Sequence, residues 1–309
     1  MPMSHRTQMQ IIKRRLSGKE GSERVRELRS ILEELPGYKN GPYADLRKWV
    51  QAQIEDSRAR SRVVQRDSIA VRREGAAQIA LVGAPNAGKS SLLHALSEVQ
   101  IKIADYAFTT LRPVPALTRI HGVLLQLVEI PGLIAGASQD RGGGRALLGV
   151  LRNADAIVFC QDVRAPLDAL TDVRAEVAAA GINRPAILAA TKMDEAQPED
   201  LARLRAAVPE LAVIGVSAID DVSLEAFKDA LWQLSGLLRV YLKRDGQATD
   251  EPIALQPGAT VADVAADIHH EVAATCRGGR IWGPSARFEG QLVGRDHIVR
   301  DGDAIEIVT

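Results

Sequence analysis

A glycine-rich loop between a short apolar run and a helical pattern constrains this chain more than any other feature. The apolar run at residues 78–82 predicts a strand, and residues 91–96 predict a helix. The loop between them fits the pattern G-x-x-x-x-G-K-[ST] in full. Its members are Gly83, Ala84, Pro85, Asn86, Ala87, Gly88, Lys89 and Ser90. Backbone N–H groups of such a loop can wrap phosphate oxygens at a helix N-terminus, so the loop and Ser91 after it predict a nucleotide site.

The last two residues of this loop carry side chains suited to a nucleotide and its metal. Lys89 is expected to neutralise the β- and γ-phosphates, and the Ser90 hydroxyl is expected to ligate Mg²⁺. The alternative is a plain glycine turn, and the strand and helix around the loop argue against it.

Strands and helices continue to alternate after the loop. Near-continuous apolar runs predict strands at residues 124–130, 154–162, 186–190 and 212–216. Helical patterns separate them at residues 167–180, 198–207 and 222–234. Buried strands that alternate with helices are typical of a parallel sheet covered on both faces, so residues 76–235 are predicted to form one α/β domain.

The two ends of the chain differ from this central part. Residues 1–75 carry 17 Lys and Arg against 10 Asp and Glu, and amphipathic stripes predict helices at 22–35 and 43–73. Such a basic segment favours nucleic acid or a ribosomal surface as partner, and a solvated charged helix is the alternative. Residues 236–309 predict one helix at 260–274 among short strands, as in a ubiquitin-like β-grasp domain. These strands are expected at residues 238–242, 251–255, 280–282, 287–289 and 304–308.

A second motif indicates which base the nucleotide carries. Thr191, Lys192 and Asp194 follow the predicted strand at 186–190, and Ser217 and Ala218 follow the next strand. A carboxylate at Asp194 can accept hydrogen bonds from the ring N–H and the exocyclic amine of guanine. Adenine lacks both donors and would leave this buried carboxylate unpaired, which favours GTP over ATP.

Two segments between these motifs have the chemistry to sense a γ-phosphate. The loop at 106–110 carries Thr109 and Thr110, and Glu129 and Gly132 follow the strand at 124–130. The glycine-rich stretch at 136–145 suits a segment that orders with GTP and relaxes after hydrolysis, and an ordinary surface loop is the alternative.

The composition excludes several classes of protein. At 46% hydrophobic and 25% charged residues, the chain is not largely disordered. Its two cysteines, Cys160 and Cys276, are too few for a disulfide scaffold and fit a reducing compartment. No apolar run approaches the ~18–20 residues of a membrane span. We therefore expect a cytoplasmic protein without a membrane partner, and nothing indicates DNA specificity.

The motifs together resemble a known family. The runs G-A-P-N-A-G-K-S, I-A-D-Y-A-F-T-T-L, E-I-P-G-L-I-A-G-A and G-G-R-A-L-L are similar to those of the Obg-related GTPases, and within them of the developmentally regulated GTP-binding (DRG) branch. The C-terminal run R-V-Y, T-V-A-D-V-A, R-I-W-G and D-G-D resembles the TGS domain of that branch. The resemblance implies a P-loop NTPase of the Ras-like G-domain type, followed by a β-grasp TGS domain. The insertion that DRG proteins carry before the guanine motif has no counterpart here.

The resemblance also implies roles for individual residues. Ser90 and Thr110 match the magnesium ligands of the family, and Glu129 stands in place of its usual aspartate. Asn86 matches the P-loop asparagine of GTPases that K⁺ activates. Leu133 stands where a Ras-like protein has the glutamine that orients water, so hydrolysis needs another route. The catalytic candidates are Lys89, Thr110, Gly132 and Asn86.

These patterns predict a GTP-binding switch that slowly hydrolyses GTP to GDP with Mg²⁺ and, by resemblance, K⁺. By the same resemblance its partner is RNA or the ribosome, reached through the TGS domain and the basic segment. Two alternatives stay open. One is a nucleotide-dependent RNA- or protein-binding module with little hydrolysis, to which Glu129, Leu133 and the Thr191 that replaces the usual asparagine point. The other is an ATPase of the same superfamily, against which Asp194 argues.

Overall fold

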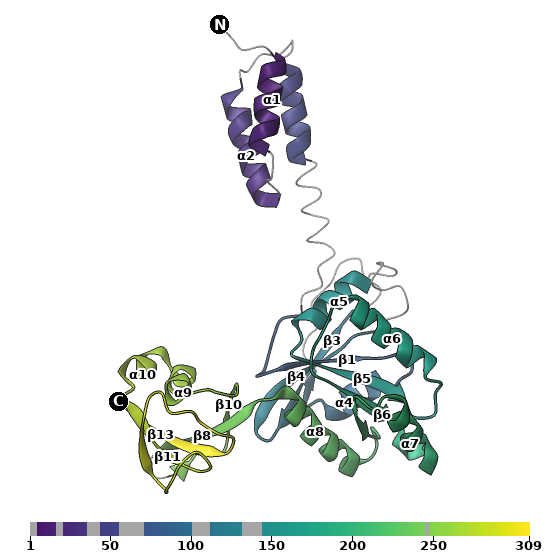
Figure 1. The fold of residues 1–309 in the computed structure, drawn as a ribbon, viewed down its shortest axis with the longest axis vertical. Helices are drawn as coiled ribbons and strands as arrows, with labels where there is room; N and C mark the ends of the chain where they lie inside the picture. The colour runs from purple at the N-terminus through teal and green to yellow at the C-terminus, as the bar shows by residue number, and fades with distance from the viewer. Residues whose placement is uncertain are drawn as a thin grey trace. The chain divides into compact units, whose positions relative to one another are not determined.

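The computed structural model separates the chain into two compact units, Met1–Ser68 and Ile69–Thr309 (Figure 1). It describes residues 5–16, 21–35, 44–55, 71–100, 112–131, 144–244 and 247–309. None of the described helices is both long enough and apolar enough to cross a membrane. Both cysteines are buried and free.

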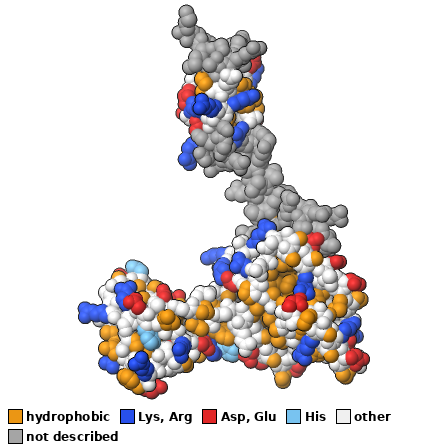
Figure 2. Space-filling view, in the orientation of Figure 1, with side chains coloured by type: hydrophobic (Ala, Val, Ile, Leu, Met, Phe, Trp, Pro, Cys, Tyr) orange, Lys and Arg blue, Asp and Glu red, His pale blue; other side chains and the backbone are white. Residues whose placement is uncertain are grey.

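The first unit is helical, as its amphipathic stripes predict. It contains α1 (His5–Leu16), α2 (Gly21–Glu34) and a further helix at residues 44–55. Their apolar faces meet in one core, formed by Ile12, Leu16, Leu28, Ile31, Leu35, Leu46, Val50 and Ile54. On the outside, Arg15 pairs with both Glu27 and Glu34 of α2, and charges of both signs are interspersed over the described surface in Figure 2.

One of the two predicted helices in this unit needs a correction at its end. The helix predicted at 22–35 is confirmed as α2. The helix predicted at 43–73 is helical at 44–55 but not at 71–73, and residues 56–70 lie outside the described part. Residues 58–62 (R-A-R-S-R) already lack the apolar stripe that holds a helix on a core.

The second unit contains a seven-stranded sheet in the order β2-β3-β4-β1-β5-β6-β7. Five strands are parallel: β4 (Val123–Glu129), β1 (Gln78–Val82), β5 (Ala156–Asp162), β6 (Ala186–Thr191) and β7 (Ala212–Gly215). The prediction of a parallel sheet holds for these strands. It is wrong for the sheet edge, where β3 (Val114–Ile120) and β2 (Val99–Gln100) pair antiparallel. β3 and β4 form a hairpin because His121 and Gly122 adopt positive φ in a two-residue turn.

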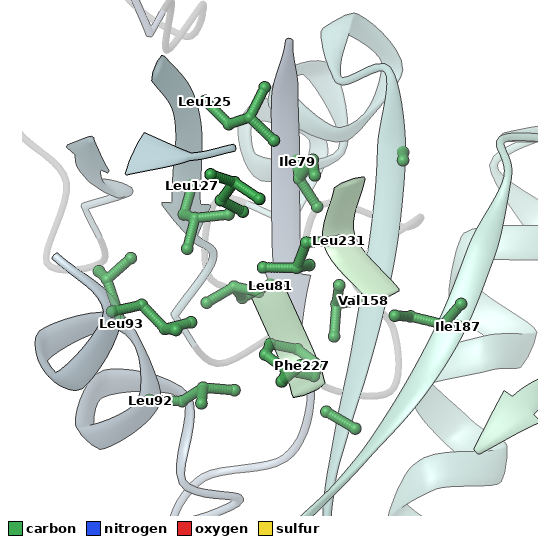
Figure 3. Close-up of a cluster of buried hydrophobic side chains, with 14 of the residues drawn as sticks. Ile79, Leu81, Leu92, Leu93, Leu125, Leu127, Val158, Ile187, Phe227 and Leu231 are labelled. Carbon is green, nitrogen blue, oxygen red and sulfur yellow. The ribbon is translucent and has the colours of Figure 1, made fainter. Parts of the chain in front are cut away.

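Helices cover both faces of this sheet, which explains why its strands are apolar on both sides. α4 (Lys89–Leu96) and α8 (Asp221–Ser235) share one core with Ile79 and Leu81 of β1. Figure 3 shows Leu92 of α4 and Phe227 and Leu231 of α8 around these two side chains. α5 (Gly144–Asn153), α6 (Asp168–Ala179) and α7 (Pro198–Ala207) share the other core with Ala80 and Val82. α6 is the single helix between β5 and β6.

The C-terminal residues form a second sheet in the order β10-β8-β13-β11-β12, with β9 (Gln247–Ala248) paired to β8. Its other strands are β8 (Leu238–Arg244), β10 (Ile253–Leu255), β11 (Gly278–Trp282), β12 (Gln291–Gly294) and β13 (Asp303–Val308). α9 (Val261–Ile268) and α10 (His270–Thr275) lie after β10, and Val261, Val264 and Ala265 of α9 pack against the sheet. The β-grasp fold is confirmed.

Two details of this domain correct the sequence prediction. The helix predicted at 260–274 is two helices, because His269 is extended (φ −171°, ψ 147°) and its ring caps the Glu271 N–H at the start of α10. The strand predicted at 287–289 is a turn, in which Gly290 has a φ of 72° and Gln291 accepts from the Arg287 N–H. The pairing with β11 starts only at Gln291.

Candidate nucleotide-binding site

The glycine-rich loop joins the carboxyl end of β1 to the first turn of α4, as predicted. Asn86 and Gly88 adopt left-handed φ angles of 64° and 79°, which turn the chain back toward the helix. A Cβ on Gly83 would lie 2.3 Å from the Cys160 carbonyl oxygen, so only glycine fits there. Burial raises the pKa of the Cys160 thiol to about 12, which leaves it an unreactive part of the wall behind the loop.

The side chain of Lys89 is held inside the loop. It is only 5% exposed, and its Nζ donates to the carbonyl oxygens of Gly83 (3.0 Å) and Ala84 (2.8 Å). Burial lowers the pKa of Lys89, although the nearby Glu129 carboxylate opposes that shift. A cavity of about 370 Å³ opens above the loop, and Pro85 does not line it. Its lining residues are Asn86, Ala87, Gly88, Lys89, Ser90, Ser91 and Lys192.

Ser90 and Glu129 come together beside this cavity. The Ser90 hydroxyl donates to Glu129 Oε1 at 2.7 Å, and Glu129 is 8% exposed at the end of β4. Two oxygen ligands of this kind suit a hard cation such as Mg²⁺. Within the described part of the chain, no group of three or more His, Cys, Asp or Glu side chains could hold a metal by itself. The other predicted residues of this region, Thr109, Thr110 and Gly132, lie outside the described residues.

Thr191 ties the guanine motif to the phosphate loop. Its hydroxyl donates to the Ala87 carbonyl oxygen at 2.8 Å and also lies 3.1 Å from the Gln161 carbonyl oxygen. A Cβ on Gly88 would lie 3.1 Å from Thr191 Cβ, so the loop and the strand end are closely packed. Thr191 stands where the resemblance predicts asparagine, and its hydroxyl makes the connection to the phosphate loop that the asparagine is expected to make.

Asp194 lies at the other end of the site, where it faces the loop after β7. Its side chain is exposed, so the expectation of a buried carboxylate at this position is wrong. Its Oδ1 accepts from the Ser217 hydroxyl at 2.5 Å. Together they border a second cavity, of about 220 Å³, which shares three residues with the first cavity. The lining residues are Gly88, Ser91, Leu92, Thr191, Lys192, Asp194, Val216, Ser217, Ala218 and Ile219. The two cavities therefore form one elongated site, with Lys89 at one end and Asp194 at the other.

Asp162 also belongs to this site, although no sequence motif predicted it. Asp162 ends β5, and its Oδ2 accepts from Lys192 Nζ at 2.8 Å. Burial by itself would raise the pKa of Asp162, but the hydrogen bonds from Lys192 and from the Arg164 N–H lower it. The carboxylate fixes the end of the Lys192 side chain. The sequence could have indicated this residue, because Asp162 ends a predicted parallel strand and ligands bind at the carboxyl edge of such sheets.

Comparison with family models agrees with this geometry. Residues 78–192 match the model described as a 50S ribosome-binding GTPase, and residues 238–309 match the TGS domain.

Curated relatives carry names of the same kind. An uncharacterised GTP-binding protein of Methanocaldococcus jannaschii is 29% identical, over 91% of this chain and 92% of its own length. The developmentally regulated GTP-binding protein 2 homologue of Dictyostelium discoideum is 29% identical, over 78% of this chain and 85% of its own. Developmentally regulated GTP-binding protein 1 of Xenopus laevis is also 29% identical, over 77% and 84%.

One solved structure supports the fold. A GTP-binding protein from Pyrococcus horikoshii matches with a TM-score of 0.50 and 16% identity, over 75% of this chain and 99% of that one. The G domain of the FeoB iron transporter of T. maritima matches with a TM-score of 0.44 and 23% identity, over 52% of this chain and 98% of that one. The predicted resemblance, of a G domain followed by a TGS domain, is confirmed by the family models and the named relatives.

Proposed function

We infer that this chain, which is a homologue of the DRG-type GTP-binding proteins with a GTPase domain and a C-terminal TGS domain, is a molecular switch that slowly hydrolyses GTP to GDP and phosphate. One observation carries the proposal. A cavity above the phosphate loop, lined by Lys89 and Ser90, continues into a cavity lined by Asp194, and Gly88, Ser91 and Lys192 line both. A guanine nucleotide carries its phosphates at one end and its base at the other. The phosphates would lie at Lys89 and Ser90, and the base at Asp194.

Each end of the site has a defined task in this proposal. Lys89 exchanges its two carbonyl partners for phosphate oxygens and so stabilises negative charge on the β/γ bridge. Ser90 and Glu129, with Thr110 by resemblance, would hold Mg²⁺, which neutralises phosphate charge when it is bound. Gly132 follows β4 in the sequence, and in this proposal its N–H donates to the γ-phosphate. Because Leu133 has no group that orients water, we expect the intrinsic rate of the in-line attack to be low.

Potassium is the proposed means of activation, through Asn86. We expect phosphate release from GTP to be about tenfold or more faster in KCl than in NaCl at equal ionic strength, and to stop when Mg²⁺ is chelated. Multiple-turnover phosphate release by the full chain measures both effects. Equal rates in the two salts would remove the potassium proposal. Tight GTP binding with phosphate release only over hours would favour the module with little hydrolysis.

The proposed partner is RNA or the ribosome, reached through the TGS domain and the basic first 75 residues. Support comes from the match to the TGS model and from the excess of Lys and Arg in that segment. Sedimentation with ribosomes should increase with a non-hydrolysable GTP analogue, relative to GDP, and fall as salt rises. Pull-down with and without RNase separates RNA from protein contacts. If the amount of protein that sediments with ribosomes changes with neither the nucleotide nor the salt concentration, the proposal is contradicted. We place the protein in the cytoplasm by analogy with such partners.

A further inference from the structure

The turn between β3 and β4 packs against the TGS domain, which belongs to the same compact unit of the chain. A Cβ on Gly122, the second residue of this turn, would lie 2.6 Å from Pro252 Cδ, so the backbone of the turn lies directly on the residue that precedes β10. Beside it, Arg119 of β3 donates to Glu251 Oε1 at 2.9 Å and to the Gly122 carbonyl oxygen at 3.1 Å. The tip of the hairpin is therefore fastened to the residues before β10, and this contact forms the joint between the G domain and the TGS domain.

His121, the first residue of the same turn, connects the joint to α8. Its Nε2 lies 3.0 Å from Asp229 Oδ1, and its ring meets the Trp232 ring edge-on, with the centroids 5.8 Å apart. The Arg239 guanidinium of β8 lies over the same Trp232 ring, 5.6 Å from its centroid, and Asp301 accepts two hydrogen bonds from that guanidinium. Trp232 is thus shared between the hairpin tip and the TGS domain.

The joint is packed on one side and open on the other. Ala254 of β10 packs against the core that α4 and α8 share with β1, and Leu237, which precedes β8, is buried in the same core. A cavity of about 500 Å³ remains beside them, lined by His121 and Trp232 from the G domain and by Arg239 from the TGS domain. Close-packed side chains transmit a displacement, whereas a cavity gives side chains room to rearrange, and the joint has both.

The other end of the same hairpin belongs to the nucleotide site. β3 and β4 pair at every residue of Val114–Ile120, and these seven pairs extend over about 20 Å. β4 ends at Glu129, whose carboxylate accepts from the Ser90 hydroxyl. Thr110 precedes β3 in the sequence and Gly132 follows β4. One paired ribbon therefore connects the nucleotide site with the joint.

We propose that the β3–β4 hairpin couples the nucleotide to the TGS domain, so that replacing GDP by GTP shifts the hairpin and changes how firmly its tip holds that domain. The inference rests on the proposed function, in which Thr110 and Gly132 contact the γ-phosphate of GTP and have no such contact in GDP. The two nucleotides therefore act differently on the ends of the hairpin, which a shift between two arrangements requires. By linkage, a weaker joint must in turn change the relative affinity for the two nucleotides.

The pair of Arg119 and Glu251 is the contact best suited to a test. Their side chains are 39% and 74% exposed, so reversing either charge buries no charge and should leave the unfolding temperature close to that of the unsubstituted protein. Arg119 also lies 3.9 Å from Glu98, whereas Glu251 is on the TGS side of the joint. E251R therefore perturbs the joint without changing the G domain.

The measurement is the ratio of GDP affinity to GTP affinity in the full chain. Fluorescent GDP is displaced by unlabelled GDP and by a non-hydrolysable GTP analogue. R119E and E251R each place like charges at the joint and should change this ratio about threefold or more. R119E/E251R restores an opposite pair and should return the ratio to within about 1.5-fold of the unsubstituted protein. R174E breaks the pair of Arg174 and Glu210 at α6, on the other face of the sheet, and should leave the ratio unchanged.

The possible failures are distinguishable. If the unsubstituted protein binds GDP and GTP and the three joint variants keep its ratio, the coupling is wrong and the proposed function stands. If R119E changes the ratio and R119E/E251R does not restore it, the effect belongs to Arg119 within the G domain, and the coupling to the TGS domain is again wrong. If the unsubstituted protein binds no guanine nucleotide, the proposed function fails and this inference fails with it.

Discussion

Replacing Asp194 with asparagine should lower the affinity for GDP and GTP by about a hundredfold and allow xanthine nucleotides to bind. Guanine presents two donors on one edge, its ring N–H and its exocyclic amine, and the Asp194 carboxylate can accept both. Asparagine offers one acceptor and one donor, so its amide N–H₂ would face the exocyclic amine. Xanthine carries a carbonyl oxygen in place of that amine and therefore pairs with asparagine.

The structure provides a control that carries the same change of charge. Glu195 is adjacent in the chain, pairs with Arg164 and does not line the cavity that Asp194 and Ser217 border. E195Q should bind GDP as the unsubstituted protein does, whereas D194N should lose GDP and bind XDP. Competition titrations with GDP, XDP and ATP give the three affinities. If ATP and GTP compete equally for the unsubstituted protein, the result contradicts the assignment of guanine specificity to Asp194 and supports the ATPase alternative.

The sequence predicts the local geometry of the glycine-rich loop, because neighbouring residues set it. Gly83 to Gly88 connect the strand to the helix, and the spacing of the motif already places Lys89 at the helix N-terminus. The resemblance assigns Ser90 and Glu129 to the same metal site, and the two side chains meet in the structure because β1 and β4 are neighbours.

The parts that were missed depend on contacts between distant segments. Asp162 and Lys192 are paired only because β5 and β6 lie side by side, and neither strand pattern carries that information. The apolar pattern of residues 260–274 suits one helix, and the break at His269 is not visible in it. Phe288 is 66% exposed, so its apolar character was misleading as a strand signal.

Replacing Lys89 with methionine should abolish the preference of the site for nucleotides with more than one phosphate. Lys89 Nζ donates to the carbonyl oxygens of Gly83 and Ala84, and Lys89 lines the cavity at the glycine-rich loop. In the proposed function its charge meets the β- and γ-phosphates, and Lys89 does not line the cavity that Asp194 lines. We expect the Kd for GDP and GTP to rise by about a hundredfold or more, while the Kd for GMP changes by less than about threefold.

The stability of this variant separates a binding role from a structural one. Burial lowers the pKa of Lys89, which means that the folded protein disfavours the charged ammonium and gains little stability from it. Methionine has a similar length and no charge to desolvate, so the nucleotide-free variant should unfold at the same temperature as the unsubstituted protein or higher. GDP should then raise the melting temperature of the unsubstituted protein but not of K89M. A variant that unfolds at lower temperature without nucleotide, or that keeps its preference for GDP over GMP, would show that Lys89 supports the loop and does not read the phosphates.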